Sequence, residues 1–164
     1  TGILLIIYFF AGVLALPLWI YLSKRYSKSK LWIVSILLAC FVFCFVPFLG
    51  EGDYIVFAVI SAISGMSLGA DMALPTSIQS DIAQESKRKG NEVSGVLFGF
   101  WAMITKLSLA LAVFITFVIL EIVDFDSKNP NALSLLTLSL LYSILPVVLK
   151  LIAIRFIINF KESN

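Results

Sequence analysis

Five long apolar runs constrain this chain more than any other feature of its sequence. Each run is close to, or longer than, the roughly 20 residues that an α-helix needs to cross the hydrocarbon core of a bilayer. The runs do not alternate between apolar and polar residues, as the strands of a membrane β-barrel do. The sequence therefore predicts an all-α integral membrane protein with transmembrane helices over residues 3–22, 31–49, 54–78, 93–123 and 132–160, which together form a single transmembrane domain.

The composition excludes an ordinary soluble domain. Of the 164 residues, 60% are hydrophobic and only 13% are charged, whereas about a quarter of the residues in a typical soluble domain are charged. A soluble domain of this size could not bury so much apolar surface, because small domains leave a large share of their surface exposed to water. We therefore expect the lipid bilayer to cover the remaining apolar surface.

The chain also lacks the side chains of common catalytic and metal sites. It has no histidine, and its two cysteines, Cys40 and Cys44, lie four residues apart in one apolar run. A structural metal site usually needs four ligands, so we interpret both cysteines as packing residues. No serine or cysteine nucleophile is paired with a base in the sequence. We expect neither an enzyme, nor a metal or organic cofactor, nor a nucleic-acid partner.

The charged residues between the apolar runs predict how the chain is oriented. Ser23–Lys30 contains four basic residues and no acid, whereas Gly50–Asp53 is acidic. Asp81–Glu92 is mixed but contains the sequence KRK, and Glu121–Ala132 contains three acids and one lysine. Basic loops mark the cytoplasmic side of a membrane. The first and third loops and the C-terminus are therefore predicted to lie on the cytoplasmic side of the cell membrane, and the N-terminus on the outer side.

Among the ionisable residues inside the predicted spans, we single out Asp71 and Lys106. A charge at the centre of a membrane helix costs about 2.5–3.5 kcal/mol on insertion scales, and such residues usually face a protein interior or a wet pathway. We therefore predict that both residues line a substrate or ion pathway, where Asp71 either pairs with Lys106 or carries a coupling proton. The alternative is an ion pair that only locks two helices together.

Small residues accompany both charges. Gly65 and Gly69 precede Asp71, and Gly95 and Gly99 precede Lys106, in each case as a G-x-x-x-G pair. Such pairs allow the backbones of membrane helices to approach closely. We expect these four glycines to be helix-packing residues.

Two segments resemble a known transporter family. Leu14–Lys30 resembles a helix and the following cytoplasmic loop of the glycoside–pentoside–hexuronide cation symporters, the melibiose carrier-like family of the major facilitator superfamily. Ala73–Ala112 is similar to a second family motif, A-L-P followed by an aspartate, a charged loop, and then G-hydrophobic-hydrophobic-hydrophobic-G-hydrophobic-W with a lysine five residues later. The matching residues are Ala73, Leu74, Pro75, Asp81, Gly95, Phe98, Gly99, Trp101 and Lys106.

The resemblance covers nearly the whole chain, as helices eight to twelve of a twelve-helix carrier. It implies the C-terminal part of a secondary transporter that couples a sugar or sugar-like solute to a cation, sodium or proton, by alternating access. The partners would be a small-molecule solute, the bilayer and the missing N-terminal half of the same transporter. Two alternatives are a lysolipid transporter of the same fold and a membrane-embedded accessory or scaffold protein without transport of its own.

The resemblance also implies roles for individual residues. Lys106 would contact solute and cation, with Trp101 and Thr105 in the same pathway. Asp81, with Lys24 and Arg25 of the basic first loop, would form a cytoplasmic gate. The sequence departs from the family where Ala83–Ser86 replaces an acidic run, and where Asp71 replaces a small or apolar residue.

Overall fold

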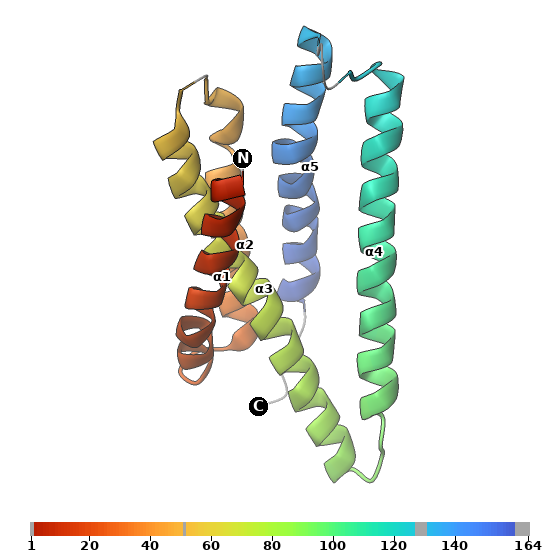
Figure 1. Cartoon of the computed structure of the whole chain (residues 1–164). Coiled ribbons are helices and arrows are strands. Elements are labelled where there is room, and N and C mark those ends of the chain that lie inside the picture. The colour runs from red at the N-terminus through yellow and green to blue at the C-terminus, as the bar shows by residue number, and fades with distance from the viewer. Residues whose placement is uncertain (1, 51, 127–130, 160–164) are drawn as a thin grey trace. The chain divides into compact units, whose positions relative to one another are not determined.

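The computed structural model describes residues 2–50, 52–126 and 131–159. Within those ranges the chain is helical and contains no strand, and five of its segments are long and apolar enough to cross a membrane (Figure 1). This finding confirms the predicted fold class, an all-α membrane protein. The elements are α1 (Gly2–Ser23), α2 (Lys28–Phe43), the 3-10 turn η1 (Val46–Phe48), α3 (Tyr54–Arg88), α4 (Ser94–Ile122) and α5 (Ala132–Ile158).

Helix α2 ends at Phe43, six residues before the end of the predicted second span. Pro47 explains the early end, because proline has no backbone N–H to donate to the carbonyl of Phe43 and disfavours helical backbone at the residue before it. The chain instead forms the short turn η1 around Pro47. Glu51 in the following loop, 127–130 in the fourth loop, and Phe160 and Lys161 near the C-terminus lie outside the described residues.

Helix α3 corrects the expected third loop. Residues 81–88, predicted to be part of a polar loop, continue the helix, which has 35 residues and a length of about 52 Å. The helix ends in a Schellman motif: the N–H of Asn91 donates to the carbonyl of Ser86, and the N–H of Gly90 donates to that of Lys87. Gly90 has φ of +85°, a conformation that glycine adopts without strain.

The helical residues divide into two compact units. The first comprises Thr1–Ile78 and Ser143–Asn164, and thus contains α1, α2, the first part of α3 and the second part of α5. The second comprises Gln79–Tyr142, with the end of α3, all of α4 and the beginning of α5. Each unit is described below by itself.

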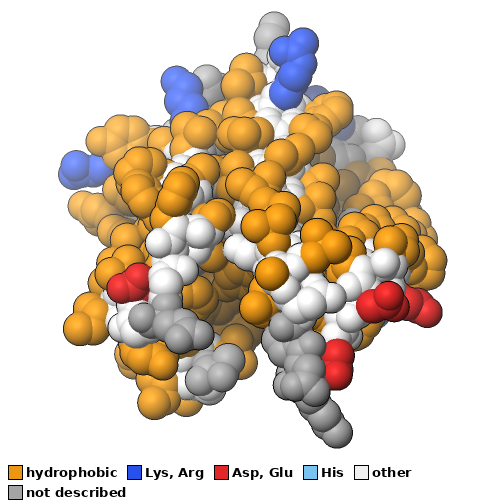
Figure 2. Space-filling view, turned by 90° about the horizontal axis from the view of Figure 1, so that it is seen from above, with side chains coloured by type: hydrophobic (Ala, Val, Ile, Leu, Met, Phe, Trp, Pro, Cys, Tyr) orange, Lys and Arg blue, Asp and Glu red, His pale blue; other side chains and the backbone are white. Residues whose placement is uncertain are grey.

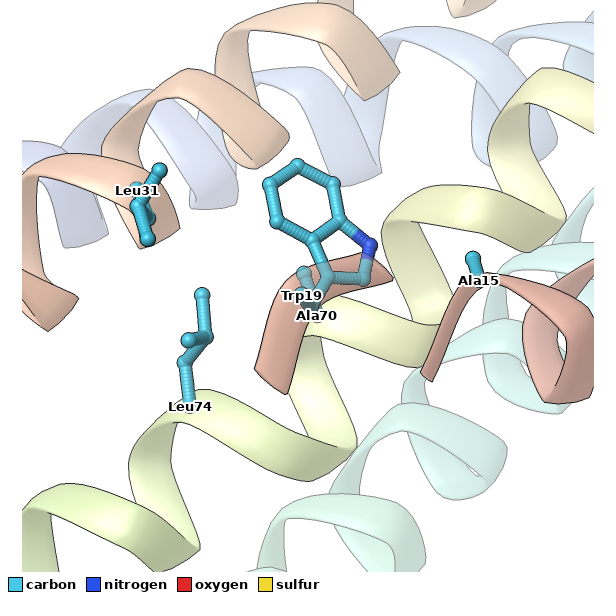
Figure 3. Packing of buried hydrophobic residues seen from close by; sticks show 5 residues of the cluster. All are labelled: Ala15, Trp19, Leu31, Ala70 and Leu74. Carbon is cyan, nitrogen blue, oxygen red and sulfur yellow. The ribbon is translucent and has the colours of Figure 1, made fainter. Parts of the chain in front are cut away.

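The first unit has an apolar core where α1, α2 and α3 meet. Figure 3 shows this cluster, in which the side chain of Trp19 is surrounded by smaller apolar groups. The indole N–H of Trp19 donates a hydrogen bond of 2.8 Å to the carbonyl of Met66, so the largest side chain of the core also has its polar atom satisfied. The cluster consists of Ala15, Trp19, Leu31, Ala70 and Leu74.

Glycines bring α1 and α3 into backbone contact within this unit. A β-carbon added to Gly69 would lie 2.5 Å from the carbonyl oxygen of Gly12, and one added to Gly12 would lie 3.1 Å from that of Gly65. A β-carbon on Gly65 would overlap the carbonyl of Tyr8. Gly65 and Gly69, the expected packing pair, therefore lie directly against α1.

A second cluster of the first unit joins α5 to α2. Val147 and Ile157 of α5 are buried with Ile36 and Cys40 of α2. The thiol of Cys40 also donates to the carbonyl of Val147, with an S···O distance of 3.9 Å. These contacts place the second part of α5 against α2.

The second unit has little interior of its own. None of the described residues of α4 is buried, and large side chains such as Phe114 and Phe117 are 65% and 68% exposed. Figure 2 shows apolar side chains over most of the visible surface of the chain. At the start of α5 the Ser134 hydroxyl donates to the carbonyl of Val123, which follows α4, with an O···O distance of 3.1 Å. Most of the apolar surface of α4 is thus available to lipid or to further protein.

Candidate functional site

Asp71 is the centre of a polar network within the first unit. Its Oδ2 atom lies 2.7 Å from Nζ of Lys150 in α5. Its Oδ1 atom accepts a hydrogen bond of 2.8 Å from Nε1 of Trp32 in α2. The Asp71 and Lys150 side chains are 31% and 26% exposed. One carboxylate therefore links three helices, with each oxygen bound to a donor from a different helix.

The positions of these residues along their helices agree on the depth of the network. Asp71 and Lys150 lie about 26 and 27 Å from the N-terminal ends of α3 and α5, whereas Trp32 lies about 6 Å from the start of α2. A bilayer core is roughly 30 Å thick. The network is therefore close to the end of the first unit that carries the basic loop Ser23–Lys30.

Hydroxyl groups add a second polar contact between α2 and α3. Ser67 donates to the carbonyl of Ser35 (3.1 Å), and Ser35 donates to the carbonyl of Ser67 (3.3 Å). Both serines are fully buried. Ser67 precedes Asp71 by one helical turn, so the two contacts lie on neighbouring turns of α3.

The structure gives Asp71 a different cation from the one that the sequence suggested. Its carboxylate binds Lys150 and Trp32, whereas Lys106 lies on α4 in the other unit. Sequence reasoning missed Lys150, although the signal was present: an ammonium group inside the apolar run 132–160. Trp32 lies near the start of its apolar run, where tryptophan is common as an anchor at the membrane surface. Pairing between residues 79 positions apart depends on tertiary packing and leaves no local pattern.

Lys106 lies on an exposed face of α4 that changes character along its length. Toward the N-terminus this face has Gly95, Gly99 and Ala102, and a β-carbon on either glycine would meet nothing within 4 Å. On the other side, Lys106 borders a shallow hollow along the same helix. The hollow is lined by Leu109, Ala110, Val113, Phe114 and Phe117.

Trp101 and Thr105, the other expected pathway residues, are exposed on α4. The Thr105 hydroxyl donates to the carbonyl of Trp101, with an O···O distance of 2.9 Å. Trp101 is 39% exposed. At 100° per residue, Trp101 points well away from Lys106, whereas Thr105 lies on its flank. Lys106 and Thr105 are therefore the closer pair.

The three expected gate residues are all exposed at helix ends. Lys24 and Arg25 lie in the turn between α1 and α2, and the Arg25 guanidinium lies 5.9 Å from the centre of the Tyr21 ring. Asp81 lies in the last part of α3. Lys24 and Arg25 belong to the first unit and Asp81 to the second.

The described part of the chain holds no group of three or more histidine, cysteine, aspartate or glutamate side chains that could bind a metal ion. Cys40 is buried and Cys44 is exposed, and both thiols are free. We therefore take the Asp71 network and the Lys106 face as the candidate sites.

Comparison with known proteins gives one family and one relative. The family model described as MFS/sugar transport protein matches residues 1–162. The sphingosine-1-phosphate transporter MFSD2B of Xenopus tropicalis is 23% identical over 152 residues, which cover 90% of this chain and 29% of that protein. The chain thus spans less than a third of the length of this relative. No solved structure gives a significant match.

Both comparisons are with transporters rather than enzymes, and the five long apolar helices of the described residues agree with a multi-pass position in the lipid bilayer. The family match extends over almost every residue, including α4 with Lys106 and the Asp71 network. This chain belongs to the MFS/sugar transport protein family of the major facilitator superfamily.

Proposed function

We propose that this chain is part of a secondary transporter that moves an amphiphilic solute with an anionic group, and that Lys106 binds that group. The observation that carries the proposal is the position of Lys106 on α4, between a small-residue segment and an apolar hollow. Lysine in the middle of a membrane helix is costly unless it faces a polar ligand or water.

The geometry of a helix gives this face a direction. Side chains tilt toward the N-terminus of a helix, so we expect the ammonium group of Lys106 to reach toward Ala102 and Gly99, where the glycine leaves room for a polar head group. The apolar hollow on the other side, from Leu109 to Phe117, suits a hydrocarbon tail. A head of negative charge and an apolar tail would satisfy both halves of the face.

The relative supports this solute class by its name. Sphingosine-1-phosphate combines a phosphate with a long hydrocarbon chain, which is the chemistry that the Lys106 face suits. The sequence also raised the alternative of a lysolipid transporter of the same fold, and a lysolipid is an amphiphile of the same class.

A second candidate is the cation-coupled symport of a sugar or sugar-like solute, in the melibiose carrier-like subfamily. The family description names sugar transport, and the Thr105 hydroxyl beside Lys106 is a group that commonly binds sugar hydroxyls. The coupling cation would be sodium or a proton. Solute class therefore decides between the two candidates.

We further propose that the chain forms helices eight to twelve of a twelve-helix carrier, with its C-terminus in the cytoplasm of the cell. The exposed apolar surface of α4 supports this arrangement, because an N-terminal half of the same transporter would cover part of it. In this arrangement Asp81, Lys24 and Arg25 would form the cytoplasmic gate. An accessory protein without transport of its own is the competing reading.

The proposal is tested with the complete protein reconstituted in liposomes. Uptake of a fluorescent lysophosphatidic acid is compared with uptake of a radiolabelled disaccharide, each with and without sodium and proton gradients. We expect uptake of the anionic amphiphile, and we expect Lys106→Ala to lower it by tenfold or more, since a buried charge-assisted contact is worth about 1.5–3 kcal/mol. Lys106→Arg should retain part of the activity.

Lys89→Gln is the matched control, because Lys89 is an exposed lysine paired with Glu85 on the surface. Uptake of the disaccharide alone, dependent on a cation gradient, would replace the first candidate with the second. Transport of neither solute class would favour the accessory role. Unchanged uptake by Lys106→Ala would remove Lys106 from the site.

A further inference from the structure

We infer that Lys150 is a positioning residue which, with Trp32, holds Asp71 as a fixed counter-ion and thereby clasps α5 to α2 and α3. The sequence suggested three roles for Asp71: a pathway partner of Lys106, the carrier of a coupling proton, or half of an ion pair that only locks two helices together. The contacts support the last of these, with Lys150 in place of Lys106 as the cation. This role stands apart from the proposed solute class.

The first step is that both oxygens of the Asp71 carboxylate have a donor. Oδ2 binds Lys150 at 2.7 Å and Oδ1 binds Trp32 at 2.8 Å, so each oxygen has a donor with short, charge-assisted geometry. Either charge alone in a membrane would be left without compensation. Asp71 and Lys150 are therefore tolerated as a pair, whereas each would be costly by itself.

The second step concerns what else holds α5 in place. Val147 and Ile157 give it apolar contacts in the first unit, and Cys40 adds one weak thiol contact. Lipid tails are as apolar as these side chains, so apolar contact gives membrane helices little reason to prefer protein over lipid. The ion pair between Asp71 and Lys150 is a contact that lipid tails cannot replace.

The third step is register. A slip of one residue along α5 would rotate Lys150 by about 100° and shift it by about 1.5 Å, which would remove it from Asp71. The apolar face of α5 would lose much less, because one aliphatic side chain replaces another in this helix. A single buried polar contact can thus select one register, as it does in coiled coils.

Cys40 provides a local reporter of the clasp. Cys40 is 6% exposed and its thiol contacts the backbone of Val147 in α5, so release of α5 would uncover it. The experiment measures the rate at which a membrane-permeant maleimide labels Cys40. It uses the complete protein in lipid nanodiscs with Cys44→Ser, because Cys44 is exposed, and with any cysteines outside this chain replaced.

We expect Asp71→Asn and Lys150→Gln each to speed the labelling of Cys40 about tenfold or more, because each leaves one partly buried charge unpaired. The double variant D71N/K150Q should label close to the original rate, since a pair of neutral groups leaves no such charge. The exchanged pair D71K/K150D should recover in part, and Lys150→Arg should label slowly because it keeps the charge.

The matched control is the pair Glu85 and Lys89, which is equally short at 2.6 Å but exposed. E85Q and K89Q should leave the labelling rate unchanged, as expected for surface ion pairs. A wild-type labelling rate of Cys40 in Asp71→Asn and Lys150→Gln would overturn the inference. Equal disruption in D71N/K150Q, including a failure of this variant to accumulate, would also overturn it, because the charges would not then be the cause.

Failure of the single variants to accumulate, with normal accumulation of the double variant, would support the clasp. The labelling rate does not depend on transport. The inference can therefore fail while the proposed solute class holds, and the proposed solute class can fail while the inference holds.

Discussion

Gly65 of α3 lies directly against the backbone carbonyl of Tyr8 in α1, so closely that a β-carbon at position 65 would overlap it. The same crossing brings Gly69 against the carbonyl of Gly12. Close backbone approach stabilises pairs of membrane helices, because it increases van der Waals contact where no hydrophobic effect operates. The first unit therefore depends on the absence of side chains at this crossing.

The crossing predicts a graded loss of stability in three single alanine variants. A β-carbon would lie 3.1 Å from the nearest backbone oxygen at Gly12 and 2.5 Å from it at Gly69, and would overlap the carbonyl at Gly65. Gly65→Ala should therefore be the most destabilising, by about 1–3 kcal/mol or more, and Gly12→Ala the least. Thermal unfolding of the purified protein in detergent measures the order, and equal midpoints for all three would contradict it.

Two tryptophans offer a comparison of hydrogen bonds to charged and neutral acceptors. The indole of Trp19 donates to the carbonyl of Met66, and that of Trp32 donates to the carboxylate of Asp71, both at 2.8 Å. Replacement by phenylalanine removes the N–H and keeps most of the apolar surface. Hydrogen bonds contribute about 0.5–1.5 kcal/mol when neutral and about 1.5–3 kcal/mol when one group is charged.

Trp32→Phe should therefore lower the free energy of unfolding more than Trp19→Phe, although Trp19 is the more deeply buried indole. Chemical denaturation in a mild detergent gives the two free energies of unfolding. If Trp19→Phe lowered the free energy of unfolding more, apolar packing rather than the charged acceptor would determine the cost of losing an indole. Asp71 would then contribute less to stability than we propose.

The membrane spans could be predicted from the sequence because their signal is local. Run length and composition alone identify a helix that must cross a bilayer, since its backbone has no other way to satisfy its hydrogen bonds. The polar residues 81–88 carry no such signal, because a helical segment outside the membrane has the same polar composition as a loop. Its end at Gly90 was readable in principle, from glycine after a basic turn.

The candidate site was predictable only in part, for a different reason. The cost of a buried charge identifies Asp71 without any structure. The choice of Lys150 over Lys106 as its partner depends on how α3 and α5 pack, and both lysines interrupt an apolar run in the same way. Trp32 shows the same limit, because an indole near a helix end serves equally well as an interfacial anchor.

Gly90 predicts a local effect at the end of α3. Its φ of +85° suits glycine, and asparagine tolerates this left-handed region better than other residues. Gly90→Ala should cost about 1 kcal/mol and Gly90→Asn clearly less. Limited proteolysis between Lys87 and Glu92 should be faster in the alanine variant, and equal cleavage of all three proteins would show that the Schellman motif does not form.

The proposed orientation predicts opposite labelling of two exposed aromatic residues. Tyr26 lies in the basic turn between α1 and α2 and is 60% exposed, whereas Phe48 lies near the acidic loop after α2 and is 84% exposed. Because α2 separates them, the two sites should lie on opposite sides of the membrane. In a Cys44→Ser background, a membrane-impermeant maleimide should label Phe48→Cys in intact cells. Tyr26→Cys should be labelled only after the cells are permeabilised, and the reverse pattern would invert the topology and place the gate residues Lys24 and Arg25 outside.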